Sequence, residues 1–184
     1  MSISFGLRRF LQQLRYDELR LFQQFTQMAG TGDRLCLKDI PPEKGEAVSA
    51  FFALLVEQDI LTLVSEQGAH GNIWRLNRRL YDQLLPASYQ TPKGIVLLVA
   101  QEFQQPVAHI LGHEHRKPAV FATKVVAWLM YNNGRGTTSQ ADIGKELNRA
   151  QSTVCTDIIF IGQAMLEDPA FNARVMRLYA RIYG

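Results

Sequence analysis

Five polar side chains near position 150 have the types and spacing that suit hydrogen bonding to a nucleic acid. Arg149, Gln151, Ser152, Thr153 and Thr156 stand at the start of a segment that the sequence pattern predicts as a helix. Guanidinium, amide and hydroxyl groups pair with base edges in the DNA major groove, which the first turns of a recognition helix enter. The cluster suggests contact with duplex DNA, although a solvated helical hairpin in a larger bundle would show the same pattern.

Two predicted helices position these side chains. Ser139 suits the N-cap of the first helix, and Asp142 can reach back to the unsatisfied amides of that turn. Ile143 and Leu147 give this helix one buried face. After a turn over residues 148–150, the second helix is predicted to bury one apolar stripe. The stripe consists of Val154, Ile158, Ile161 and Met165.

The composition is that of an ordinary globular protein, with 47% of the 184 residues hydrophobic and 20% charged. The net charge of +3 is spread over both halves, so any DNA contact must come from placed side chains, not from bulk charge. The longest apolar run, residues 95–100, is far shorter than the roughly 20 residues of a membrane helix. The first residues show no signal-peptide pattern, so we expect a cytoplasmic protein.

Metal, disulfide and enzyme chemistry find little support. Cys36 and Cys155 lack CxxC spacing, so we expect two reduced, buried thiols and no zinc site. One cluster has a metal-like composition: His109, His113, Glu114 and His115. It is interrupted by Gly112 and lacks HExxH order, so a solvent-facing or phosphate-facing loop fits it better. Because no Ser or Cys stands in a nucleophile motif either, we predict a protein without enzymatic activity, cofactor or metal.

Residues 1–90 are predicted to be helices followed by a small β-hairpin. Apolar spacing indicates two helices before residue 29, a short strand at 34–37 and an apolar helix at 43–58. Strands at 60–64 and 73–76 flank a turn at 68–71. This order resembles that of winged-helix domains.

The resemblance implies that the helix at 43–58 enters a groove and that the wing tip, with His70, meets the DNA backbone. That helix, however, carries three glutamates against one lysine, which favours a protein contact over base reading. Phe51 and Phe52 on it would serve a homodimer interface or the core equally well. The arginines after the hairpin could meet phosphates or form a solvated face. They are Arg75, Arg78 and Arg79.

Four segments of the second half, after a break at residues 91–94, occur in a recognisable order. They are residues 99–111, 116–130, 140–154 and 168–182. Together they resemble the C-terminal DNA-binding domain of the bacterial replication initiator DnaA. The family has a short Val-Ala helix, a basic long helix and a Glu-Ile-Gly turn. A Gly-Arg-Asp-His-Ser/Thr-Thr-Val signature and a closing helix follow. The resemblance covers residues 94–184, with about two extra residues near 134–136.

This resemblance implies duplex recognition by a helix-turn-helix whose signature, here residues 148–154, reads the major groove. Arg149, Ser152, Thr153 and Val154 agree with that signature. Ala150 and Gln151 replace the family's acidic residue and histidine, so the target site must differ; a glutamine amide suits adenine.

The family's minor-groove arginine, at the start of the long helix, is replaced by Phe121. Lys124, Lys117 or Arg116 stands near enough to substitute for it. The chain also lacks the GxxxxGK[ST] loop that would hold ATP, so it is not expected to be an initiator itself.

We therefore predict a mainly α protein with two domains. Residues 1–90 form a winged-helix-like domain with a small β-hairpin, and residues 91–184 form an all-helical helix-turn-helix domain. The expected function is sequence-specific binding of double-stranded DNA in transcription or replication regulation. The alternative is a protein-interaction adaptor of the replication or partition machinery. The expected DNA-contacting residues are Arg149, Gln151, Ser152, Thr153, Ser139, Gln140, Thr156, Lys124, Arg116 and Lys117.

Overall fold

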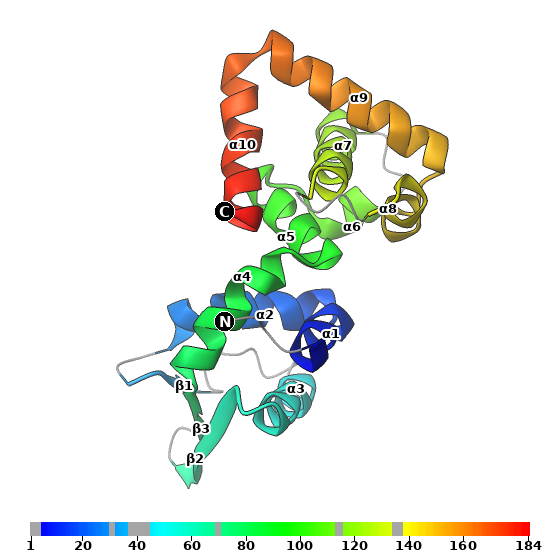
Figure 1. Ribbon diagram of the computed structural model, residues 1–184. Coiled ribbons are helices and arrows are strands. Elements are labelled where there is room, and N and C mark those ends of the chain that lie inside the picture. Colours follow the sequence, from blue (N-terminus) through cyan, green and yellow to red (C-terminus); the bar gives the residue numbers. More distant parts are fainter. Residues whose placement is uncertain (1–4, 30–31, 37–44, 69–70, 113–115, 134–137) are drawn as a thin grey trace. The chain divides into compact units, whose positions relative to one another are not determined.

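The computed structural model describes residues 5–29, 32–36, 45–68, 71–112, 116–133 and 138–184. The chain divides into two compact units, Met1–Ser88 and Tyr89–Gly184. The described residues form ten helices and a three-stranded antiparallel sheet, which confirms the mainly helical fold with a small β element (Figure 1). No helix in these ranges is both long and apolar enough to cross a membrane.

The first unit places a small sheet among four helices (Figure 1). Its elements are α1 Phe5–Gln13, α2 Tyr16–Met28, β1 Arg34–Cys36, α3 Gly45–Glu57, β2 Leu61–Gly68, β3 Gly71–Leu76 and α4 Arg78–Tyr89. The expected hairpin is confirmed, since β2 and β3 pair antiparallel, and β1 joins on the other side of β3. Residues 37–44, which include the start of the helix expected at 43, lie outside the described residues, as does His70 of the expected wing tip.

An aromatic cluster forms the core of this unit. Phe25 of α2 lies 5.8 Å from Phe22 and 5.7 Å from Phe52, measured between ring centroids. Tyr81 of α4 closes the cluster and donates its hydroxyl hydrogen to the Phe22 carbonyl at 2.9 Å. Phe51 and Phe52 are each only 1% exposed. Of the two roles considered for this pair, the structure supports the core, where both rings are buried.

The inner face of the sheet packs against that cluster. Leu35 and Leu63 flank Trp74 in register, and the Trp74 ring stands at 90° to Phe52 with centroids 5.4 Å apart. Trp74 is thus a core residue, as expected. At the end of the sheet Arg78 binds the Asp33 carboxylate, with Nε 3.0 Å from Oδ1. Arg78, one of the three arginines that could meet phosphates or form a solvated face, is therefore engaged within the unit.

In the described residues of the second unit, every secondary-structure element is a helix. Its elements are α5 Pro92–Glu102, α6 Val107–Leu111, α7 Lys117–Tyr131, α8 Gln140–Leu147, α9 Gln151–Glu167 and α10 Pro169–Tyr183. Helix α7 is central, because α5, α6, α8 and α9 all pack against it (Figure 1). Alanine and valine fill much of its buried surface, which allows neighbouring helices to approach closely. Helix α7 therefore supports both α8 and α9.

Two expectations about buried residues in the second unit are corrected. Trp128, whose apolar neighbours in the sequence predict a core position, is only half-buried, because it lies on the flank of α7 with its ring edge-on to Tyr179 at 6.4 Å. Cys155 is a half-buried free thiol and not a buried one. Tyr183 is half-buried as well; it donates to the Leu129 carbonyl at 3.0 Å, and burial raises the pKa of its phenol.

Candidate nucleic-acid interface

The first helix of the interface, α8, begins at a side-chain cap, as expected. The Ser139 Oγ accepts from the Asp142 amide at 3.1 Å and donates to the Asp142 carboxylate at 2.7 Å. The hydrogen bond from this hydroxyl, followed by the nearby Lys145 charge, lowers the pKa of Asp142. Asp142 thus binds the capping hydroxyl and not an amide, which corrects the expected box. Because the Ser139 proton is already donated to a carboxylate, Ser139 serves as a cap and is a poor phosphate donor.

A tight turn connects α8 to α9 where the sequence placed it. Asn148 adopts a left-handed conformation with φ 53°, which an asparagine tolerates better than most residues. The Arg149 amide then donates to the Gly144 carbonyl at 2.8 Å. Gly144 lies directly under this turn, since a Cβ at that position would stand 2.6 Å from the Arg149 backbone oxygen. The turn therefore requires a residue without a side chain at position 144.

Helix α9 is divided into a buried face and an exposed one. Val154, Ile158 and Ile161 are buried as predicted, whereas Met165 is only half-buried because it lies near the helix end. The polar residues at the start of the helix are all exposed within the unit: Gln151, Ser152, Thr153 and Thr156. Ala150, the N-cap, contributes no side-chain hydrogen bond. The predicted separation of an anchoring face from a free polar face is therefore present.

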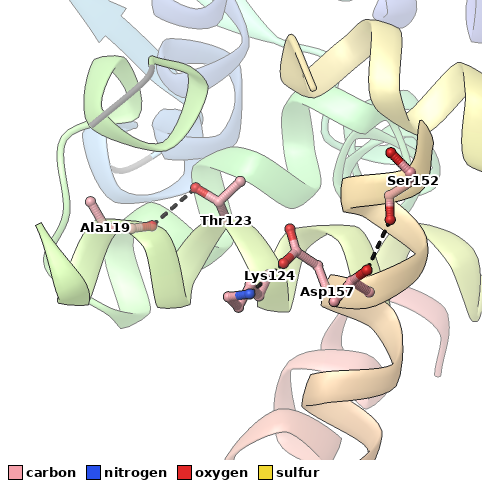
Figure 2. Close-up of polar contacts among 6 residues, drawn as sticks. Ala119, Thr123, Lys124, Ser152 and Asp157 are labelled. Carbon is pink, nitrogen blue, oxygen red and sulfur yellow. Dashed lines mark hydrogen bonds and ion pairs between the residues drawn. The ribbon is translucent and has the colours of Figure 1, made fainter. Parts of the chain in front are cut away.

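A buried ion pair fixes α9 against α7. Lys124 Nζ bonds to the Asp157 carboxylate, and their side chains are only 21% and 10% exposed (Figure 2). The same ammonium lies 4.8 Å from the Phe160 ring centroid. Lys124, which was expected to contact DNA, is thus bound to Asp157 within the unit. Asp157 is not among the residues expected from the sequence, although an acidic residue between Val154 and Ile158 of an apolar face was a usable signal.

Arg149 also has a structural partner. Its Nη2 donates to the Gly112 carbonyl at 2.8 Å, which ties the turn to the end of α6. A guanidinium has five donor hydrogens, so this bond leaves it the capacity to bind a phosphate as well. The half-buried side chain is therefore held in place at the edge of the polar helix start.

The remaining expected contacts lie at two helix starts. Arg116, the N-cap of α7, and Lys117, its first residue, are both exposed. Gln140, at the start of α8, is half-buried. Phe121, where the initiator family has its minor-groove arginine, instead packs on Phe171 with ring centroids 5.0 Å apart. A charged side chain at position 121 would lose this aromatic contact. The exposed positive charges at the start of α7 are therefore those of Arg116 and Lys117.

The histidine cluster falls largely outside the described residues. Only His109 of that cluster is described, and it is half-buried on α6; His113, Glu114 and His115 are not described. No group of three or more metal-ligating side chains comes together in the part of the chain that the structure describes.

Comparison with known proteins adds no relative. No protein-family model matches the sequence, and no curated protein matches it. The class of protein must therefore be argued from the two helical elements, the turn between them and the exposed polar residues of α9.

The close approach at Gly144 leads to a stability prediction. Gly144→Ala should destabilise the chain by about 2–3 kcal/mol, since the added methyl meets backbone that cannot turn away. Gly162→Ala is the matched control: it lies within α9 with no atom within 4 Å of the added carbon. The control should be neutral or stabilising by up to about 1 kcal/mol. Urea denaturation measures both, and equal effects would show that the turn does not depend on Gly144.

Proposed function

We propose that this chain is a sequence-specific double-stranded DNA-binding protein that regulates transcription or replication. In this proposal α8, the turn at 148–150 and α9 form a helix-turn-helix similar to that of the initiator DnaA. In the same proposal the first unit is a winged-helix-like domain, which the antiparallel hairpin of β2 and β3 among helices supports. The observation that carries the proposal is the exposed polar start of α9 opposite a buried apolar face on the same helix.

The dimensions and chemistry of the helix start suit the major groove. From Gln151 to Thr156 the helix rises roughly 8 Å at 1.5 Å per residue, within the groove width of about 12 Å. The exposed Gln151 amide can pair with an adenine edge, and Ser152 and Thr153 offer hydroxyls. Thr156 donates to the Ser152 carbonyl at 3.0 Å, which leaves its oxygen as an acceptor and its methyl for a thymine.

Cations around this surface supply the sequence-independent attraction. Arg116 and Lys117 are exposed at the start of α7, and Arg149 flanks the polar start of α9. Lys124 is excluded because it is paired with Asp157. The proposed DNA-contacting set is therefore Gln151, Ser152, Thr153 and Thr156 for bases, with Arg116, Lys117 and Arg149 for phosphates.

A carboxylate placed in the proposed groove-facing surface should abolish tight binding. We expect Thr156→Glu to weaken binding of the full chain to duplexes selected from a random library by more than tenfold, because the new charge meets acceptor-rich base edges and phosphates. Thr156 is exposed, so the fold should tolerate the change. Ala173→Glu, exposed on α10, is the matched control with the same change of charge.

The measurement is fluorescence anisotropy of labelled duplex at fixed salt. The control should bind as the wild type does, while Gln151→Ala should keep the affinity but broaden the set of selected sequences. Equal loss in Thr156→Glu and Ala173→Glu would show only a dependence on net charge. Failure of the wild-type chain to select any duplex would refute the proposal.

A protein-interaction adaptor is the second candidate, and one observation favours it. The later part of α9 exposes apolar side chains, with Ile159 57% and Leu166 86% exposed. Such residues are more common in protein contacts than in phosphate contacts. An adaptor would bind random duplex DNA weakly through either unit, so the anisotropy titration separates the two candidates.

A further inference from the structure

Two arginines are held side by side on the outer face of the sheet in the first unit. Arg34 of β1 is directly opposite Arg75 of β3, and Arg75 is directly opposite Thr62 of β2. All three are exposed, whereas Leu35 and Trp74, one residue along each strand, are buried. Since side chains alternate between the two faces of a strand, these three residues form one row on the outer face.

Among the described residues, the positive charge of this row has no acidic partner. Like charges directly opposite each other on neighbouring strands destabilise a sheet. Neither guanidinium forms an ion pair with any described residue. The acidic residue next to Arg34 in sequence, Asp33, is already bonded to Arg78. Within the part of the chain that the structure describes, the two guanidiniums therefore repel each other, and an anion bound between them would turn this repulsion into attraction.

We propose that the row of Arg34, Arg75 and Thr62 binds the phosphate backbone of duplex DNA. Directly opposite residues have Cα atoms about 5 Å apart, so both guanidiniums can reach one phosphate or two adjacent ones. Guanidinium donors match phosphate oxygens in a bidentate geometry, and the Thr62 hydroxyl adds a donor beside them. That the ligand is DNA rests on the proposed function. The pairing of the two arginines is independent of it, because it follows from strand register.

This surface differs from the set expected from the sequence. Arg75 belongs to both sets. Arg78 does not belong to this row because it is paired with Asp33, and Arg34 is added because strand register places it opposite Arg75. No base edge is read by these side chains. The row should therefore contribute to affinity for every duplex equally and leave sequence preference to α9.

The test is the salt dependence of duplex binding by the full chain. In Arg34→Gln/Arg75→Gln, the slope of log affinity against log salt should fall by about 2, because each lost phosphate contact lowers it by about 0.9. Arg9→Gln/Arg20→Gln is the matched control, since both arginines are exposed on helices of the same unit. The control should keep the wild-type slope. The melting temperature of the test variant should be unchanged or higher, because a like-charge pair has been removed.

The outcomes separate this inference from the proposed function. If the wild type binds duplex and the Arg34/Arg75 variant keeps its slope, the inference is wrong and the α9 proposal stands. An equal fall in slope for the Arg9/Arg20 control also overturns it, since the attraction would then be diffuse. If binding to phosphatidylserine vesicles is lost in the variant while the DNA slope is unchanged, the occupant is a membrane surface. A wild-type chain that binds no duplex refutes the proposed function and this occupant together.

Discussion

Asp157→Ala is expected to destabilise the second unit by about 2–4 kcal/mol. The substitution leaves the Lys124 ammonium between α7 and α9 without its carboxylate, and a nearly buried unpaired charge is costly. We place the value below the range for fully buried pairs because the Lys124 side chain is 21% exposed. The change also frees α9 from the helix that orients it.

Urea denaturation followed by Trp128 fluorescence, in a Trp74→Phe background, reports on the second unit alone, since the chain has two tryptophans. Lys145→Ala is the control within the same unit, because Lys145 pairs with Asp142 at 3.5 Å with both side chains more than half exposed. It should cost under about 1 kcal/mol. In Lys124→Met/Asp157→Leu, apolar groups replace both charges, so most of the lost stability should return. An Asp157→Ala effect no larger than that of Lys145→Ala would mean that the pair does not hold α9.

Phe25→Ala should destabilise the first unit by about 3–5 kcal/mol, the usual range for removing a buried phenylalanine. Phe25 is fully buried and its ring lies within 6.4 Å, between centroids, of the rings of four other aromatic residues. Because α2, α3 and α4 all supply rings to this cluster, the cavity cannot close without moving a helix.

Trp74 fluorescence in a Trp128→Phe background measures this effect. Phe5→Ala, at an exposed position of α1, removes the same group and should change stability by less than about 0.5 kcal/mol. Phe25→Leu should recover part of the loss because it leaves a smaller cavity. Similar losses for Phe25→Ala and Phe5→Ala would show that the aromatic cluster is not the core of the unit.

Local patterns were sufficient to predict most elements that carry the candidate site. Helices α8 and α9 begin within a residue of the predicted positions, because the Ser139 cap and the 3.6-residue apolar spacing act over a few neighbouring residues. The hairpin of β2 and β3 followed from alternating apolar residues around a turn. Capping hydrogen bonds and one-sided burial depend on residues a few positions apart. These elements could therefore be predicted from a single sequence.

The sequence by itself thus determined the helix that presents polar residues and the face by which it is anchored. Only the tertiary structure decided which charges remain available: Lys124 is paired with Asp157, 33 positions away, and Arg149 with Gly112, 37 away. Likewise, strand register brought Arg34 to Arg75, and packing placed Phe51 in the core. These partners meet only after helices and strands have packed, so no periodicity in the chain indicates them.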